Sequence, residues 1–287
     1  MLLPAAGVIL ILFFGGLFEG LLQSFGLFPA AGQLEWSSAA YVKLLAEEDF
    51  WQSLWLTLRI SLLATAASSL LGLLAAVFLF MLGKTHSLAL SRYGQRIFQF
   101  PLAVPHLIGG YLILLLFMQS GWISRLSYAV GWIDEIEDFP VLVNEPFGWA
   151  IIFAYVWKEA PFVALMVYPV LSRIHQAWFE CARVFGADPR KFVREIVLPL
   201  LTPAWMAASF IVFAFTFSAF EVPYLLGVTY PKMLPVLSYD LYMGGGLAYR
   251  SEALAINVIL AIITGGLGIW AYRISRRWNL FKGERWS

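Results

Sequence analysis

Six long apolar stretches dominate the 287-residue chain and restrict the folds that it can adopt. They cover residues 2–28, 53–82, 100–118, 148–171, 201–227 and 253–272. Each is long enough to cross a hydrocarbon core of about 30 Å as an α-helix. A transmembrane β-barrel would show alternating segments of about ten residues, and the sequence has no such pattern. We therefore expect an all-α membrane protein with six transmembrane helices, in which residues 1–287 form a single transmembrane domain.

The composition excludes several classes of protein. Charged residues make up 13% of the chain and hydrophobic residues 61%, whereas about 25% of a soluble domain is charged. A soluble enzyme and a disordered chain are both incompatible with this balance. The net charge of +1 provides no basic surface for nucleic acid. Cys181 is the only cysteine and the three histidines lie far apart, so we expect neither a disulfide nor a metal site.

The connections between the spans alternate between few and many basic residues. Those after the first, third and fifth spans carry Lys43, then Arg125, then Lys232 and Arg250. The other connections and the C-terminal tail carry Lys84, Arg92, Arg96, Arg173, Arg183, Arg190, Lys191, Arg194, Arg273, Arg276, Arg277, Lys282 and Arg285. Because basic residues are retained on the cytoplasmic side, we expect both termini and the fourth connection to face the cytoplasm. The chain would then be a multi-pass membrane protein in contact with membrane lipid.

The fourth connection, residues 174–199, contains its own signals for helix ends. A helix continuing from the fourth span over residues 180–185 would end at Gly186, because glycine tolerates a positive φ. Asp188 is a good N-cap for a second helix. Pro189 suits the first position of that helix, where its missing N–H is not needed. We therefore expect two short helices separated by a turn.

The side chains of this connection divide into an apolar and a basic set. We expect Phe185, Phe192 and Ile196 to share a buried face. The basic residues would then be left for water or for a partner, and they are Arg190, Lys191 and Arg194.

The same segment resembles a known family motif. Its pattern Glu180-x-Ala182-x3-Gly186-x9-Ile196-x-Leu198-Pro199 is similar to the EAA loop in permease subunits of bacterial ATP-binding-cassette importers. Cys181 stands where that loop usually has its first alanine. Six spans with this loop between the fourth and the fifth are also similar to the type I importer permease fold. The resemblance implies that a coupling helix docks on a separate ATPase through Glu180, Ala182, Gly186, Ala187, Asp188, Pro189, Phe192, Ile196, Leu198 and Pro199.

The resemblance also implies an assembly. Two ATP-binding subunits, a second permease chain and an extracytoplasmic solute-binding protein would join this chain. ATP-driven closure of the ATPases would move the coupling helices and turn the cavity from inward-facing to outward-facing. This chain would hold no catalytic residue and no cofactor, since ATP and Mg would bind to the partner. Gly83-Lys84-Thr85 resembles the end of a P-loop, but Phe78 stands where that motif requires glycine.

Ionisable residues within the predicted spans are candidates for the translocation pathway, because charge is costly inside a membrane. The candidates are Lys158, Glu159 and Glu221, together with Tyr224 one turn after Glu221. A proline follows each of the two glutamates by two residues, and a helix disturbed there could free carbonyls to line a cavity. A structural alternative remains open, in which Lys158 pairs with a carboxylate and locks the helix bundle.

Two features flank the third span. Residues 101–106, Pro-Leu-Ala-Val-Pro-His, are more typical of a helix entry than of a gate. In the connection after this span we expect a short amphipathic helix around Trp132.

The solute is suggested by resemblance alone. Residues 155–162 and 219–227 resemble recurrent segments of the permease branch that serves polyamine, thiamine, ferric-ion and aminophosphonate importers. That branch implies a small organic solute such as a polyamine. A secondary transporter or channel that works without an ATPase is the alternative, but inverted repeats, which are typical of such transporters, are not evident. An intramembrane hydrolase would need a partner for His106, and the sequence reveals none.

Overall fold

The computed structural model describes residues 3–29, 32, 34–85, 96, 98–174 and 176–283. Arg92 and Arg285, which belong to the predicted charge pattern, lie outside these residues, as do His86 and His175. The longer helices are α1 (Leu3–Ser24), α3 (Glu48–Thr85), α5 (His106–Phe117), α7 (Trp149–Ser172), α10 (Leu198–Ser218), α12 (Leu234–Gly244) and α13 (Gly246–Gly283). The shorter ones are α2 (Ala39–Ala46), α6 (Trp122–Ala129), η2 (Ile136–Asp138), α8 (Gln176–Val184), α9 (Pro189–Phe192), η3 (Val193–Val197) and α11 (Glu221–Leu226).

Six segments of the described chain are long and apolar enough to cross a membrane. They are Ala6–Ser24, Glu48–Phe80, His106–Ala129, Trp149–Ser172, Arg190–Ser218 and Gly246–Ile274. The prediction of an all-α membrane protein with six spans is therefore confirmed. Gly83-Lys84-Thr85 belongs to the last turns of α3, so this segment is helical rather than a phosphate-binding loop.

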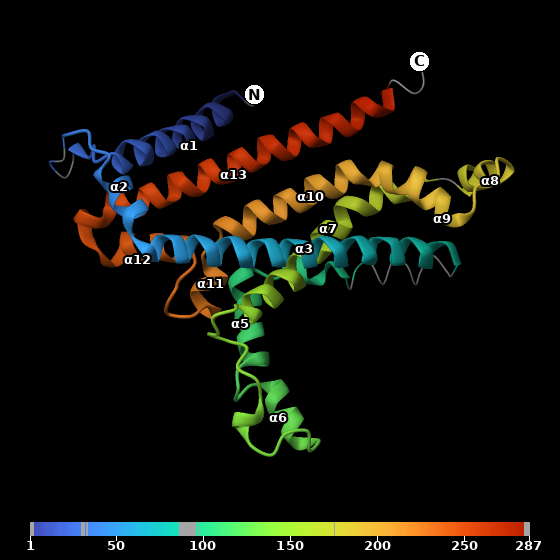
Figure 1. Cartoon of the computed structure of the whole chain (residues 1–287), viewed down its shortest axis with the longest axis horizontal. Coiled ribbons are helices and arrows are strands. Elements are labelled where there is room, and N and C mark those ends of the chain that lie inside the picture. Colours follow the sequence, from blue (N-terminus) through green and yellow to red (C-terminus); the bar gives the residue numbers. More distant parts are fainter. Residues whose placement is uncertain are drawn as a thin grey trace.

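α1, α13, α10 and α3 run roughly side by side, α7 crosses α3 at an angle, and α5 and α6 project away from them (Figure 1). The most extensive contact is between α3 and α7, and α10 packs against both of them. In contrast, α1 contacts mainly α13, and most of its large apolar side chains, such as Phe13 and Phe14, are exposed. In a membrane, such a surface faces lipid or another chain.

The contacts of α3 with α7 and α10 depend on small and polar residues. A Cβ at Gly72 would lie 2.5 Å from the carbonyl oxygen of Ala160, so only glycine allows this approach. About one turn earlier, α3 contacts α10: the hydroxyls of Ser69 and Ser209 are 2.6 Å apart, and Trp205 Nε1 donates to the Ser69 carbonyl. Close backbones and interhelical hydrogen bonds are the usual means by which helices associate in a bilayer.

The third span differs from the prediction, which placed one helix over residues 100–118. The span is interrupted instead: residues 98–103 are helical, the helix breaks at Val104 and Pro105, and α5 begins at His106. Pro105 has no N–H to donate and adopts an extended ψ, which accounts for the break. The amphipathic helix expected around Trp132 lies earlier, at α6. Gly131, at φ +74°, ends α6, and Trp132 follows it in the turn, where its N–H donates to the carbonyl of Ser127.

The two ends of the helix bundle carry different connections. The N-terminal end of α1, the C-terminal end of α13 and the α8–α9 segment all point toward one end, whereas α2 and α12 lie toward the other (Figure 1). This grouping agrees with the alternation of basic residues. The orientation of the chain across the membrane stays a prediction.

Candidate functional site

The α8–α9 segment is a helix–turn–helix. As predicted, Gly186 has a positive φ, +78°. Its N–H donates to the Arg183 carbonyl at 2.9 Å, and the Ala187 N–H donates to the Ala182 carbonyl at 3.0 Å. These two bonds form a Schellman motif, which satisfies the last carbonyls of α8. One expectation is wrong, because α8 does not continue from the fourth span: α7 ends at Ser172 and α8 is a new helix.

The second half of the turn is fixed by Asp188. Its Oδ1 accepts a hydrogen bond from the Lys191 N–H at 2.6 Å, as expected of an N-cap, and Pro189 is the first residue of α9. Phe192 is buried, and its ring packs edge-on against Phe179 at 5.2 Å between centroids. The capping signals in the sequence therefore predicted the local backbone correctly.

Between α9 and α10 the chain forms a π-helix, η3, rather than the regular helix expected there. The Leu198 N–H donates to the Val193 carbonyl, five residues earlier. Pro199 accounts for this register, because it has no N–H for the Glu195 carbonyl. Ile196 therefore lies in a wider helical turn than its spacing from Phe192 suggested.

The tip of the turn exposes apolar side chains. Phe185 is 89% exposed and Val184 is 84% exposed. The expectation that Phe185 shares a buried face with Phe192 and Ile196 is therefore wrong, because the turn at Gly186 directs Phe185 away from them. The basic residues of the segment, Arg190, Lys191 and Arg194, are exposed as expected. Large apolar groups left in water at the end of a loop are typical of a contact surface.

Lys158 and Glu159 are both buried in α7, at 3% and 8% exposure, but they have different partners. The Lys158 ammonium donates to the carbonyl of Pro101 at 2.7 Å and also to that of Val104. Glu159 Oε1 lies 3.0 Å from His106 Nε2. Among the residues that the structure describes, Lys158 therefore forms no ion pair with a carboxylate, which the structural alternative required, and its neighbour Glu159 points in a different direction from α7.

His106 and Tyr155 join this cluster, and the sequence interpretation missed both roles. The His106 ring packs on Phe215 of α10 at 4.5 Å between centroids. Tyr155 is fully buried one turn before Glu159, and its hydroxyl has no hydrogen-bond partner among the described residues. The only sequence signal for Tyr155 was its spacing of four residues from Glu159, while His106 lies 53 residues from its partner.

Glu221 and Tyr224 belong to a short helix that packs against α5 and α7. α10 ends at Ser218 in extended backbone at Ala219, and Glu221 begins the short helix α11. Both side chains are exposed, Tyr224 by 58%. The Tyr224 ring packs on Tyr239 at 5.5 Å between centroids, so the helix that carries Glu221 also carries an aromatic ring packed on α12. The structure therefore does not place Glu221 and Glu159 in equivalent surroundings.

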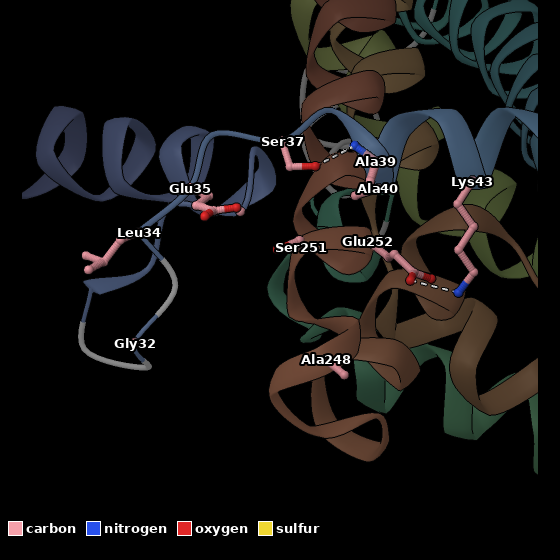
Figure 2. A pocket seen from close by; sticks show the side chains of 11 residues that line it. Gly32, Leu34, Glu35, Ser37, Ala39, Ala40, Lys43, Ala248, Ser251 and Glu252 are labelled. Atoms are coloured by element: carbon pink, nitrogen blue, oxygen red, sulfur yellow. Dashed lines mark hydrogen bonds and ion pairs between the residues drawn. The ribbon is translucent and has the colours of Figure 1, made fainter.

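A polar pocket of about 710 Å³ lies at the opposite end of the molecule from α8–α9. Figure 2 shows it between the α1–α2 connection, α2 and the start of α13. Lys43 donates to Glu252 Oε1 at 2.8 Å across it, and this hydrogen bond raises the pKa of the Lys43 amine. The Ala39 N–H donates to the Ser37 hydroxyl at its rim. The pocket is thus closed on one side by an ion pair between α2 and α13.

Comparison with known proteins places this chain among transport proteins. A family model described as "Binding-protein-dependent transport system inner membrane component" matches residues 68–279. The trehalose/maltose transport system permease protein MalF of Thermococcus litoralis is 25% identical over 237 residues, covering 77% of this chain and 74% of that protein. The putrescine transport system permease protein PotI of Escherichia coli is 27% identical over 238 residues, covering 82% and 74%. The diacetylchitobiose uptake system permease protein DasB of Streptomyces coelicolor is 27% identical over 293 residues, covering 96% and 85%.

Solved structures share the fold. A chain of a bacterial ABC transporter that imports the acidic polysaccharide alginate superposes with a TM-score of 0.79 at 22% identity, covering 96% of this chain and 94% of that chain. A chain of the MetNI methionine ABC transporter gives a TM-score of 0.59 at 20% identity, covering 84% and 99%. At these identities the similarity concerns the arrangement of helices alone.

Proposed function

The chain belongs to the family of binding-protein-dependent transport system inner membrane components, as a multi-pass permease subunit of an ATP-binding-cassette importer, and we propose how it couples and what it carries. It forms one half of the translocation pathway, beside a second permease chain. Two separate ATPase subunits bind ATP and Mg and drive the cycle. An extracytoplasmic solute-binding protein delivers the solute at the end of the molecule that carries α2 and α12. Both termini and α8–α9 face the cytoplasm.

The exposed tip of α8–α9 is the observation that carries the coupling role. Phe185 and Val184 project from a turn that the Schellman motif and the Asp188 cap hold rigid. A rigid apolar projection between exposed basic residues suits a groove on an ATPase subunit. We assign the ATPase contact to this tip and its helices, in addition to the residues of the EAA pattern. The rival class, a secondary transporter without an ATPase, provides no role for such a projection.

Glu221 and Tyr224 are the residues to which we assign solute contact. Glu221 is exposed and makes no hydrogen bond or ion pair within the described residues. A carboxylate beside aromatic faces suits an ammonium group, through charge and cation–π attraction. We propose a small organic cation such as a polyamine as the solute. Lys158 and Glu159 hold the helices next to the pathway in place and do not contact the solute. Both are buried, and both already have hydrogen-bond partners within the chain.

A neutral sugar is the second candidate. Its support is twofold: proteins similar to this chain are named for trehalose/maltose and diacetylchitobiose, and aromatic rings lie beside Glu221. The rings of Phe220 and Tyr239 stack at 4.9 Å, next to Tyr224. Flat aromatic surfaces of this kind suit the apolar face of a sugar ring as well as an ammonium group.

A thermal-shift panel on the cognate extracytoplasmic binding protein separates the two candidates. Putrescine and spermidine form one arm, and maltose, trehalose and diacetylchitobiose form the other. Stabilisation by a polyamine alone, followed by its ATP-dependent uptake into vesicles that contain the complete importer, supports the cation. Stabilisation by a sugar alone overturns the cation and transfers the aromatic surface to the sugar.

A further inference from the structure

An apolar groove of about 780 Å³ runs between α5, α6 and α7. Every residue that lines it is apolar, and the lining includes Leu112, Leu116, Trp122, Phe153 and Trp157. Both α5 and α7 lie within candidate membrane spans. Water is excluded at this depth, so the groove is filled by an acyl chain or by another protein chain.

The helix at the end of this groove has an unusual distribution of side chains. Ser124 and Ser127 are buried against the protein, whereas Trp122 and Leu126 are exposed. A helix with small polar residues inside and a large apolar face outside does not suit water. It suits the interface between headgroups and acyl chains, where tryptophan is enriched.

Arg125 lies on the same exposed face of α6 as Trp122, because the two are three residues apart. Its Nε donates to the Ser120 carbonyl at 3.1 Å, which fixes the orientation of the guanidinium group. Five carboxylates follow within the same connection, yet none of the ion pairs among the described residues includes Arg125. Within the described residues its two terminal amino groups make no hydrogen bond or ion pair, so they are available to bind a phosphate.

We propose that an anionic phospholipid occupies this site, with one acyl chain in the groove and its phosphate on the fork of Arg125. The apolar walls receive the chain, Trp122 lies at the level of the headgroup, and the fixed guanidinium provides the complementary charge. The bound lipid would hold α5 and α6 to α7 at the outer surface of the membrane. The proposal does not depend on which solute is transported.

The test uses the purified complete importer and native mass spectrometry with added lipid. Phosphatidylglycerol and phosphatidylcholine with identical acyl chains are compared, so that only the headgroup charge differs. We expect phosphatidylglycerol to bind about fivefold more tightly, as one basic residue near an anionic headgroup provides. Arg125→Gln should abolish this preference, and Leu116→Trp, which fills the groove, should weaken binding of both lipids.

Lys43→Gln is the matched control. It also removes a cation from the same side of the protein, but the Lys43 ammonium is already paired with Glu252 and is not proposed to bind lipid. It should keep the preference. An unchanged preference in Arg125→Gln would overturn the proposal. So would a photo-reactive residue at position 116 that captures the second permease chain instead of lipid, because the groove would then be a protein interface.

Discussion

His106 Nε2 lies 3.0 Å from Glu159 Oε1, and this contact joins the first residue of α5 to the middle of α7. Directly beside it, Lys158 donates to the carbonyls of Pro101 and Val104 on the other side of the break before α5. Two consecutive residues of α7 therefore hold both sides of a proline-rich break. Pro105 determines where α5 begins, and α7 holds the two sides of that break together.

Removing the Lys158 ammonium should destabilise the protein. In Lys158→Met the carbonyls of Pro101 and Val104 lose a buried donor, and each unpaired buried group costs about 1–3 kcal/mol. We expect the thermal unfolding midpoint in detergent to fall by several degrees, while the exposed control Lys191→Met leaves it unchanged. An unchanged midpoint in Lys158→Met would show that the hydrogen bonds from Lys158 to Pro101 and Val104 do not stabilise the fold.

Neutralising Glu221 should impair transport without impairing assembly. Glu221→Gln keeps the shape of an exposed side chain and removes the charge proposed to attract the solute cation. We expect the variant to assemble with its ATPase, to hydrolyse ATP and to take up solute at least tenfold more slowly at low concentration, which corresponds to about 1.4 kcal/mol. Uptake at the wild-type rate across all solute concentrations would remove Glu221 from the pathway.

Replacing Gly186 should uncouple the loop while the spans remain folded. No atom lies within 4 Å of a Cβ at Gly186, so the cost of Gly186→Val comes from its φ of +78° alone. A β-branched residue in this conformation costs at least about 1–2 kcal/mol. We expect solute-stimulated ATPase activity to be lost and membrane insertion to persist. Gly266→Val, in the interior of α13 with equal space around it, is the control and should retain coupling.

The proposed orientation can be tested without any reference to the family. Single cysteines at positions 137 and 277, in a Cys181→Ala background, should lie on opposite sides of the membrane. An impermeant maleimide added to intact cells should label position 137 only, and position 277 should react after the cells are opened. Labelling of both positions in intact cells would contradict the six-span topology.

Local chemistry was readable from the sequence, whereas contacts between distant segments were not. The apolar lengths gave the spans, and Gly186 and Asp188 marked the turn because helix caps depend on near neighbours. The partners of Lys158 and His106 lie more than 50 residues away, so no spacing rule indicates them. A periodic pattern also cannot show that a missing proline N–H widens the helix at η3.

The central claim is that the α8–α9 tip is the surface that contacts the ATPase. Co-purification with the ATPase is its most direct test. Phe185 is exposed and makes no buried contact in the isolated chain, so Phe185→Asp should leave the permease folded. In the assembled importer, however, the same change would bury a carboxylate in an apolar contact, which is strongly unfavourable. We predict that the wild-type chain co-purifies with a stoichiometric ATPase subunit and that Phe185→Asp inserts normally but loses that subunit. Equal recovery of the ATPase with both chains would contradict the docking of this tip.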